Sequence, residues 1–386
     1  MKRLELIALR TAVGLLMGLI LALMVVRVLY GGGEPYPDLS TAPAVPSSDV
    51  EVLVELDLPP GNVTSAADGR IFFNTHPFAQ SQRFADAFLF ELVEGQPRPY
   101  PNEALQPDLQ WVFGMTVDRQ GRLWVISPAT LDRERTRLQA FDLTTDERVV
   151  DHEFEPGVAR FSQDLRIMPD GRTAILADTG AFRFTSASIL VVDLQTWQVR
   201  ERLEGHPSTQ PQDWTIATEH GPHSVGWGLV TFSVGVDGIA VSPDGAWLYY
   251  ATMSHDTLYR VPTEALLDAS TSDAQLAARI EPLGPKPLSD GIELTADGTV
   301  VVTDIEHGGV AAMKPGGGAG SDSLRTLVKL EDIVWADGVN VMHDGRVLLT
   351  DSAIPEYLDP WLRPPARERL EAGRPYRIYR FATPGR

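Results

Sequence analysis

The chain has no cysteine among its 386 residues. This absence excludes disulfides, thiolate nucleophiles, cysteine-ligated zinc, iron–sulfur clusters and a lipoprotein anchor. Basic residues are also scarce, with 33 Lys and Arg against 52 Asp and Glu. Residues 1–33 hold 4 basic residues and 1 acid, so the rest of the chain carries 29 against 51, a net charge of −22. We therefore expect neither nucleic acid nor an anionic lipid surface to bind the body.

Several sequence signatures of catalysis are missing as well. The chain contains no His-Glu-x-x-His, no Gly-x-Ser-x-Gly, no P-loop and no EF-hand loop. Nothing in these signatures indicates a zinc protease, a serine hydrolase or a nucleotide cofactor. The hydrophobic content of 43% is enough to bury a core, which excludes global disorder.

The pattern of the N-terminal 30 residues predicts a membrane segment. Three basic residues, the last of them Arg10, precede an uncharged apolar run over 11–26 that Arg27 closes. Sixteen helical residues span about 24 Å, and flanking arginines extend that reach by snorkelling. No small-x-small site follows, so we expect an uncleaved signal anchor in the cytoplasmic membrane, with the body on the extracytoplasmic (periplasmic) side. Secretion after signal cleavage is the alternative.

Residues 31–49 are rich in Gly, Pro and Ser, without regularly spaced apolar residues. This composition predicts a tether that contributes nothing to the core. Residues 50–386 then form the body.

One phrase recurs six times through the body: a polar residue before an apolar run, an Asp-Gly-type turn, and a second apolar run. Its second glycines, at 69, 121, 171, 245, 298 and 345, are 52, 50, 74, 53 and 47 residues apart. A unit of that size holds four short strands, which is one propeller blade. The pattern predicts an all-β, six-bladed β-propeller in one domain. A two-sheet sandwich, the alternative, would not require a fixed internal phrase.

Hairpin topology brings polar residues of this phrase to one mouth of the channel, where first strands start and second strands end. Starts contribute Asn62, Asp164, Asp237, Asp290 and Asp337. Ends contribute, among others, His76, His255, Asp304, His307 and Asp351. The sequence therefore predicts an acidic ring at this mouth.

Several phrases resemble the major royal jelly/yellow protein family. They are Pro60-Gly61-Asn62, Val236-Asp237-Gly238-Ile239, Ser289-Asp290-Gly291, Thr303-Asp304-Ile305-Glu306-His307 and Tyr376-Arg377-Ile378-Tyr379-Arg380. The resemblance implies a six-bladed propeller of the kind shared with gluconolactonase-like proteins. Insect members of the family include dopachrome-converting enzymes and biogenic-amine binders, and bacterial members are often called dopachrome tautomerase-related.

One position departs from the family pattern. Where the family usually has Asn-Asp, this chain has Gln163-Asp164. In gluconolactonase-like relatives an Asn near this place helps to hold a divalent cation. The departure puts a metal-dependent activity in doubt while leaving the fold unaffected.

The ring suggests three sets of candidate site residues. Converging carboxylates repel one another in a narrow channel, and a Ca²⁺-like ion with oxygen ligands would relieve that repulsion. The expected ligands of such an ion are Asn62, Asp164, Asp237, Asp290 and Asp337.

The candidates for proton transfer are Asp237, Asp290, His255 and His307. The candidates for ligand binding, some from the long stretch 205–235, are His76, Trp214, His223, Asp304 and Asp351. Alternatively, the ring aspartates only cap the backbone where each strand begins.

Three functions remain open on the sequence alone. The first is a cation-dependent enzyme, either a lactonase-like hydrolase or a dopachrome-type tautomerase. The second is a non-catalytic protein that binds a small molecule such as an amine. The third is a scaffold for other proteins. We expect a monomer.

Overall fold

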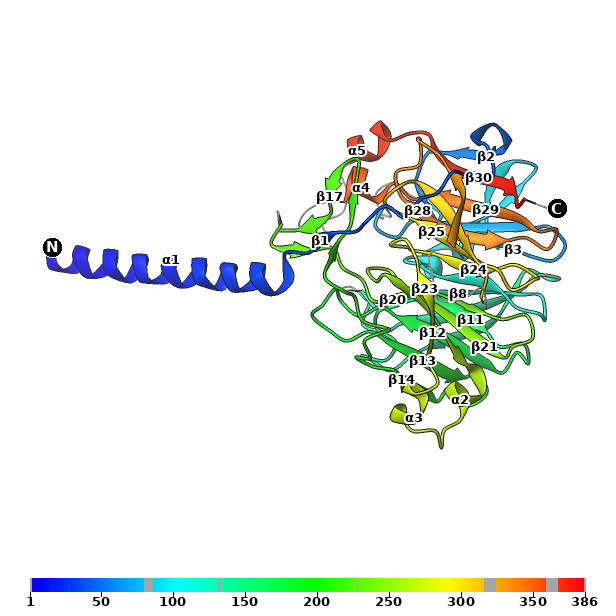
Figure 1. The fold of residues 1–386 in the computed structure, drawn as a ribbon, viewed down its shortest axis with the longest axis horizontal. Coiled ribbons are helices and arrows are strands. Elements are labelled where there is room, and N and C mark those ends of the chain that lie inside the picture. The colour runs from blue at the N-terminus through cyan, green and yellow to red at the C-terminus, as the bar shows by residue number, and fades with distance from the viewer. Residues whose placement is uncertain are drawn as a thin grey trace.

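The structure is a computed structural model that describes residues 2–79, 86–130, 133–226, 228–315, 324–358 and 367–384. Its described residues include six four-stranded antiparallel sheets (Figure 1). In each sheet the strands are given from the innermost to the outermost. The first sheet consists of β3 (Pro60–Ser65), β4 (Ile71–Thr75), β5 (Leu89–Val93) and β6 (Gln96–Pro99), and the second of β7 (Met115–Val117), β8 (Arg122–Ser127), β9 (Arg137–Asp142) and β10 (Glu147–Glu153). The third consists of β11 (Ser162–Ile167), β12 (Thr173–Asp178), β13 (Ser188–Asp193) and β14 (Val199–Arg202).

The other three sheets follow the same order. Their strands are β20 (Val236–Val241), β21 (Trp247–Thr252), β22 (Thr257–Pro262), β23 (Glu281–Pro285); β24 (Ile292–Leu294), β25 (Val300–Asp304), β26 (Gly309–Met313), β27 (Leu324–Lys329); and β28 (Ala336–Val341), β29 (Arg346–Asp351), β30 (Tyr376–Ala382), β2 (Glu51–Leu56). Each innermost strand contacts those of the two neighbouring sheets, which closes a ring. The predicted six-bladed β-propeller is confirmed.

Short strands and helices lie outside the six sheets. A parallel pair joins β1 (Glu34–Pro35) to β15 (Trp214–Thr215). The insertion before blade four adds β16 (Ala217–Thr218), β17 (Gly221–Pro222), β18 (Ser224–Val225) and β19 (Val230–Thr231). The short helices are η1 (Ser47–Asp49), η2 (Glu103–Leu109), α2 (Thr263–Leu267), α3 (Asp273–Ala277), α4 (Ile354–Tyr357) and α5 (Arg367–Ala372).

The hydrophobic core lies between the blades. In blade five, Val300 and Val302 pack with residues of blade four, whereas Val301 packs with residues of blade six. The second strand of a blade is buried on both faces, so it reads as a continuous apolar run instead of an alternating one. The core joins each blade to the next, and we expect the body to unfold cooperatively.

The Asp-Gly turns form as the phrase predicts. All six second glycines have positive φ, for example +94° at Gly69 and +84° at Gly345. A residue with a Cβ adopts this conformation only with strain, which explains the glycine at this position of every copy.

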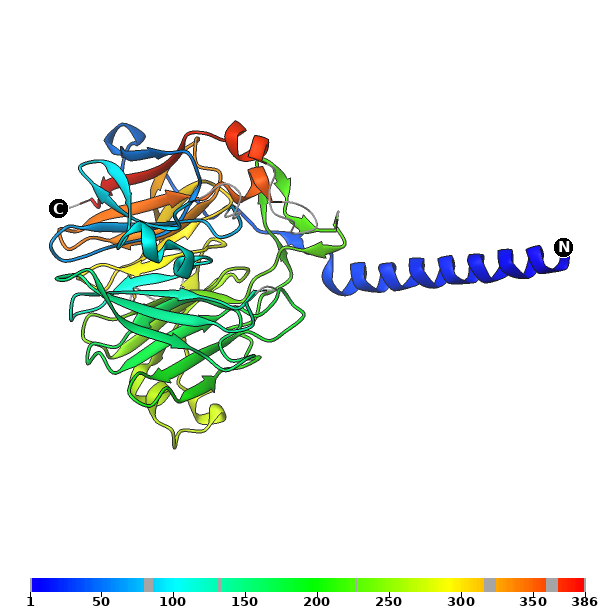
Figure 2. The ribbon, with the colours of Figure 1, turned by 180° about the vertical axis from the view of Figure 1, so that it is seen from behind.

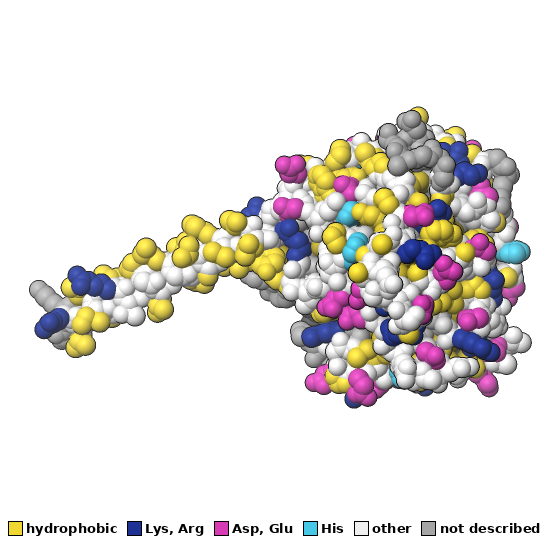
Figure 3. Space-filling model, turned by 60° about the horizontal axis from the view of Figure 1, so that its bottom comes forward, with side chains coloured by type: hydrophobic (Ala, Val, Ile, Leu, Met, Phe, Trp, Pro, Cys, Tyr) yellow, Lys and Arg dark blue, Asp and Glu magenta, His cyan; other side chains and the backbone are white. Residues whose placement is uncertain are grey.

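The N-terminal segment is the helix α1 (Lys2–Tyr30). Its stretch Arg3–Tyr30 is long and apolar enough to cross a membrane, although a signal sequence would meet the same criteria. Figure 3 shows apolar side chains along this helix where it projects from the body. The predicted apolar helix is confirmed. Its compartment and orientation stay predictions.

Residues 31–49, which we call the strap, lie along the body. The backbone of Val45 donates to Leu327 O (2.8 Å), and its side chain is 6% exposed within the core between blades five and six. Our prediction that this segment supplies no core residue is wrong. A single buried valine among prolines and small residues produces no periodicity that sequence analysis could detect.

Candidate functional site

A β-bulge occurs near the start of four inner strands. In β20 the register shifts between Val236 and Gly238, which places Asp237 inside the bulge, and Asp337 lies in the corresponding bulge of β28. Similar shifts enclose Gly61 and Asn62 in β3 and Gln163, the residue before Asp164, in β11. A bulge turns a side chain away from the regular alternation of a strand. The local geometry of the phrase thus directs its first polar residue toward the channel.

The glycines that follow Asp237, Asp290 and Asp337 have a separate role. A Cβ on Gly238 would lie 2.7 Å from Asp290 O, and one on Gly291 would lie 2.7 Å from Asp337 O. Neighbouring inner strands therefore approach too closely for any larger residue. The phrase combines a side chain for the channel with a glycine for blade packing.

The mouth holds a cavity of about 400 Å³. Its floor contains all five residues of the predicted ring: Asn62, Asp164, Asp237, Asp290 and Asp337. Its walls are largely aromatic, with Phe78, Trp111, Phe113, Phe161, Phe182 and Phe232. Of the other predicted site residues, His76 also lines it. The structure therefore brings six of the predicted residues to one cavity; their functional role stays a prediction.

Sequence analysis missed the aromatic wall because its members lie on loops without a repeated pattern. Two of them, Trp111 and Phe182, have left-handed backbone, with φ of +64° and +52°. Non-glycine residues in this region are strained, and such strain is concentrated at functional sites. Six other described non-glycine residues with positive φ lie outside the cavity lining, so this backbone strain does not by itself assign a binding role to the wall.

Three carboxylates of the floor lack a counter-charge. Burial and the neighbouring carboxylates raise the pKa of Asp237 and of Asp337 well above the ordinary range. Burial raises the pKa of Asp290 to about 6, although Trp335 Nε1 donates to its Oδ2 at 2.8 Å. The Oδ2 atoms of Asp237 and Asp337 are buried and have no hydrogen-bond partner within 3.5 Å among the described residues, although the nearby Ser352 side chain opposes the rise in the pKa of Asp337. We call these three residues the acidic floor.

His76 does not neutralise the acidic floor. Its Nε2 lies 3.6 Å from Asp337 Oδ2, but burial lowers the pKa of its imidazole to about 3. The ring is therefore neutral near pH 7. Its Nε2 is also too far from Asp337 Oδ2 for a hydrogen bond.

Asp164 differs from the other aspartates of the ring. Its Oδ1 accepts from Arg166 Nη1 (2.8 Å) and from the backbone of Leu165 (2.7 Å), and its Oδ2 accepts from the backbone of Ile239 (3.0 Å) in the next blade. Glu293 Oε2 lies 3.6 Å from Arg166 Nη2. Asp164 thus joins two blades and pairs with a buried guanidinium, as the strand-entry alternative predicts for some of these residues.

Asn62 is also occupied locally, because its Oδ1 accepts from the backbone of Val63 at 2.8 Å. Gln163, at the position where the family usually has Asn, donates from Nε2 to Thr179 Oγ1 at 3.2 Å. Among the described residues, the oxygens of the acidic floor do not form a group within 4.8 Å of one another. The five predicted metal ligands are therefore not equivalent.

Two further candidates lie in buried networks outside the cavity lining. His255 Nδ1 lies 3.1 Å from Asp256 Oδ1, and burial lowers the pKa of its imidazole to about 4. Asp351 accepts from the backbone of Val334, Trp335 and Ala353. Burial raises the pKa of Asp351 to about 7. The contacts of both residues organise loops around the mouth.

The two candidates from the insertion also lie outside the cavity lining. Trp214 Nε1 donates to Gln212 Oε1 at 2.6 Å, and the Trp214 ring packs edge-on against Tyr36. His223 Nε2 is 3.0 Å from Thr218 Oγ1. These contacts place Trp214 against the strap and His223 within the insertion.

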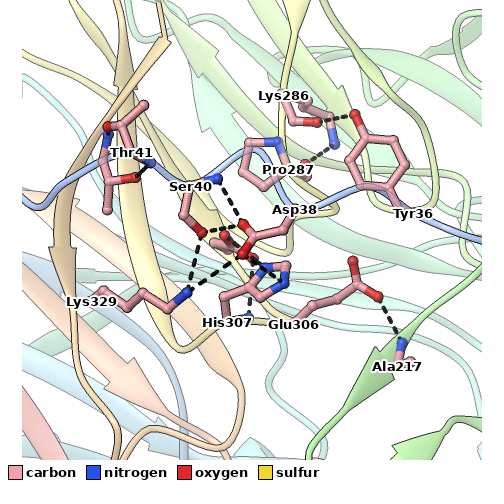
Figure 4. Close-up of polar contacts among 12 residues, drawn as sticks. Tyr36, Asp38, Ser40, Thr41, Ala217, Lys286, Pro287, Glu306, His307 and Lys329 are labelled. Carbon is pink, nitrogen blue, oxygen red and sulfur yellow. Dashed lines mark hydrogen bonds and ion pairs between the residues drawn. The ribbon is translucent and has the colours of Figure 1, made fainter.

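Asp304 and His307 meet the strap away from the cavity. His307 Nδ1 lies 3.0 Å from Asp304 Oδ1, and its Nε2 lies 3.7 Å from Asp38 Oδ2 (Figure 4). Lys329 Nζ lies 3.8 Å from the same carboxylate oxygen of Asp38. Asp38, Asp304 and His307 thus form a group of three potential metal ligands within 4.8 Å of one another, but their side chains are already paired. We interpret it as a polar latch that holds the strap.

Replacing His307 with Gln is expected to lower the melting temperature more at pH 6 than at pH 9. The hydrogen bond to Asp304 raises the pKa of His307 above its ordinary value. The stability that the imidazolium contributes is therefore complete below about pH 6.5 and is lost as the pH rises through the raised value. Thermal melts of the variant and of His343→Gln, an exposed histidine elsewhere, test this. Equal losses at both pH values for His307→Gln would contradict it.

Comparison with known proteins agrees with this architecture. A gluconolactonase from Xanthomonas campestris has a similar structure, with a TM-score of 0.52 and 12% identity over 87% of this chain and 89% of that chain. Regucalcin from Agrobacterium tumefaciens, described as a calcium-binding protein, gives 0.51 and 16% over 86% and 92%. At these identities the likeness concerns the fold alone.

No curated protein matches the chain. The sequence model of the family described as "Major royal jelly protein" matches residues 110–359, which is 250 of 386 residues. This span includes four of the five residues of the predicted ring, together with Arg166 and most of the aromatic wall. The resemblance that the repeated phrases indicated is confirmed, and the chain belongs to the major royal jelly protein family.

Proposed function

We propose that the cavity binds a small organic molecule by placing a positively charged group over the acidic floor. The observation that carries this proposal is the pair of buried, unpartnered oxygens, Asp237 Oδ2 and Asp337 Oδ2. Buried polar atoms without partners are rare in native proteins and cost free energy. A ligand that donates hydrogen bonds to them would remove that cost.

The charges around the floor favour a cationic ligand. Arg166 is already paired with Asp164, and His76 is neutral near pH 7. A bound cation would hold the three carboxylates in their ionised form and relieve their repulsion. The aromatic wall would pack against the apolar part of the molecule and, where a ring faces the charge, add a cation–π attraction.

The number of available acceptors at the floor favours an organic amine over a bare metal ion. Ca²⁺ takes about 6–8 oxygen ligands, whereas a primary ammonium group has three N–H donors to satisfy. Asn62 and Asp164 accept hydrogen bonds from their surroundings, which leaves the three carboxylates of the acidic floor. Non-catalytic capture of an amine is therefore the first candidate.

A cation-dependent enzyme is the second candidate, favoured by the all-oxygen donor set of the floor. Asn62, Asp237 and Asp337 would hold a Ca²⁺-like ion together with water. Such an ion polarises a carbonyl or a bound water, as lactone hydrolysis or tautomerisation of an oxidised catechol requires. Asp290, with a pKa of about 6, would move the proton. Structurally similar proteins include a gluconolactonase and a calcium-binding regucalcin.

We further propose that α1 stays uncleaved and anchors a monomeric body on the extracytoplasmic side of the cytoplasmic membrane. The basic residues before its apolar run and the absence of a cleavage site support this orientation.

A matched pair of probes tests the proposed function. Phenethylamine and phenethyl alcohol share an apolar body, but only the amine carries a charge. We expect the amine to raise the melting temperature of the detergent-solubilised protein, and the alcohol to have little effect. Asp290→Asn keeps an acceptor for Trp335 but removes one charge, so it should weaken amine binding about tenfold or more.

Calcium chloride provides the third arm of this experiment. Stabilisation by Ca²⁺ that Asp290→Asn weakens would select the cation-dependent enzyme. If neither the amine nor Ca²⁺ stabilises the wild type, the proposed function is wrong.

A further inference from the structure

One loop belongs both to the cavity wall and to the attachment of α1. Thr179, Gly180, Ala181 and Phe182 line the cavity. Two residues further on, the ring of Phe184 lies with its centroid 4.6 Å from that of Tyr30, the last residue of α1. We call residues 179–187 the shared loop. The wall of the cavity is therefore in contact with the end of the apolar helix.

The chain after α1 is fastened to the same side of the body. Strand β1 pairs with β15, and Gly33 O accepts from Thr215 Oγ1 at 3.0 Å. Tyr36 then donates to Lys286 O at 2.8 Å. Only three residues separate the end of α1 from the first of these strand contacts. Little slack remains for the body to move away from the end of the helix.

The two ends of the propeller are clearly different. Arg346 follows an Asp-Gly turn and pairs with Ala382, so the C-terminus lies at the turn end of the channel. Figures 1 and 2 show α1 leaving the body at the opposite end, beside β1 and β17. By hairpin topology that opposite end is the mouth. The cavity and the anchor therefore share one end of the propeller.

The helix also indicates the level of the bilayer surface. Arg27 closes the uncharged run, and Tyr30 lies one turn, about 5 Å, beyond it. Arginine and tyrosine at this position are typical of the headgroup region. Phe184, which contacts Tyr30, is 53% exposed. An exposed phenylalanine at this level would have lipid as its neighbour.

We propose that the mouth of the cavity faces the membrane that holds α1, and that the cavity takes up an amphipathic amine from the bilayer surface. The inference rests on the anchor and on the cationic ligand of the proposed function. An amphiphile in the facing leaflet turns its charged group toward the water and the protein. Asp237 and Asp337 are buried, whereas Phe78, Trp111 and Phe182 of the wall are partly exposed, so such a molecule would enter with its charged group first. Its apolar part would then follow along the aromatic wall.

Charge favours the same choice of ligand. The body carries a net charge of −22, which attracts a cationic amphiphile and disfavours an anionic lipid. An apolar wall above a charged floor matches a molecule with a long apolar part and one cationic end. Short polar amines would leave the aromatic wall without a partner.

The absence of cysteine allows a direct test with single labels. Ser186→Cys places one thiol on the shared loop, and Ala67→Cys places one on the turn end; both positions are exposed. Each full-length variant carries a nitrobenzoxadiazole fluorophore in phosphatidylcholine vesicles that contain lipids with a nitroxide near the headgroup. We expect quenching at position 186 to be at least about threefold stronger than at position 67. Equal, weak quenching at both positions in protein that remains in the vesicles would overturn the membrane-facing mouth.

The ligand class is tested in the same vesicles without label. Dodecylamine should raise the melting temperature of the wild type but not that of Asp237→Asn, and dodecanol should raise neither. If phenethylamine binds the solubilised protein but dodecylamine in vesicles does not, uptake from the bilayer is wrong and the proposed function stands. Strong quenching at position 186 without binding of either amine would instead contradict the proposed function.

Discussion

Removing residues 1–57, and with them β2, is expected to leave no folded propeller, whereas removing residues 1–49 leaves a folded body. Strand β2 is the outermost strand of blade six and pairs with β30 from Leu56↔Tyr376 to Glu51↔Arg380. Without β2 the ring ends in an unpaired edge at β30. Such an edge is prone to pairing with other chains.

The free energy of the lost apolar contacts is large compared with the free energy of unfolding of a domain. Val54 is buried between blades six and one, and Leu53 and Leu56 pack against the same cluster. Each such side chain contributes about 1.5–3 kcal/mol when buried, against a total of about 5–15 kcal/mol for a domain. Circular dichroism and gel filtration of the two shortened chains measure the effect. A chain starting at residue 58 that melts cooperatively at the temperature of the longer one would show that β2 does not close the ring.

Asp164→Asn and Asp237→Asn are expected to change stability in opposite directions, although both residues open copies of the same phrase. Asp164→Asn removes the carboxylate that pairs with Arg166, which leaves this guanidinium with Glu293 at 3.6 Å and two backbone carbonyl oxygens. Burial raises the pKa of Asp164 as well, but Arg166 and two backbone N–H groups oppose this shift, and Asp237 has no such partners. Losing one partner of a buried ion pair costs about 3–5 kcal/mol. Denaturant unfolding at pH 8 should show this loss.

Asp237→Asn removes an unpaired charge, so it should stabilise the ligand-free protein at pH 8. Burial raises the pKa of Asp237, and a carboxyl with a raised folded-state pKa loses stability as the pH rises above its unfolded value near 4. The gain in the variant is therefore absent at pH 4 and grows toward pH 8, at about 1.4 kcal/mol for each unit of pKa shift that is relieved. A loss of stability at pH 8 comparable to that of Asp164→Asn would contradict the difference between the two residues.

These two aspartates also show what sequence analysis could reach. The repeated phrase identified the blades, the turn glycines and the mouth, because each depends on contacts within one hairpin. It could not distinguish Asp164 from Asp237. Their difference depends on Arg166 and on the backbone of Ile239 in the next blade, which satisfy only Asp164. Side chains alternate along a strand, so Arg166, two residues after Asp164, is expected on the same, channel side of β11.

The positions of the candidates outside the cavity lining could not be predicted for a related reason. Second strands do end at the mouth, but His255 and His307 come after their strands, where loop contacts decide the direction of a side chain. His255 turns toward Asp256, and His307 turns toward Asp304 and the strap. The strap itself could not be predicted, because its partners Thr326 and Lys286 lie 285 and 250 residues away in the sequence.

A crystal structure of the protein purified at pH 8, with phenethylamine added, tests the acidic floor most directly. The account predicts density in the cavity within hydrogen-bonding distance, about 2.8 Å, of Asp237 Oδ2 or Asp337 Oδ2, with the aromatic part against the wall. A sphere of density about 2.4 Å from the same oxygens would identify a calcium-like ion and the second candidate function. An acidic floor whose two oxygens contact neither amine nor ion at pH 8 would contradict the central claim that these carboxylates bind a positive charge.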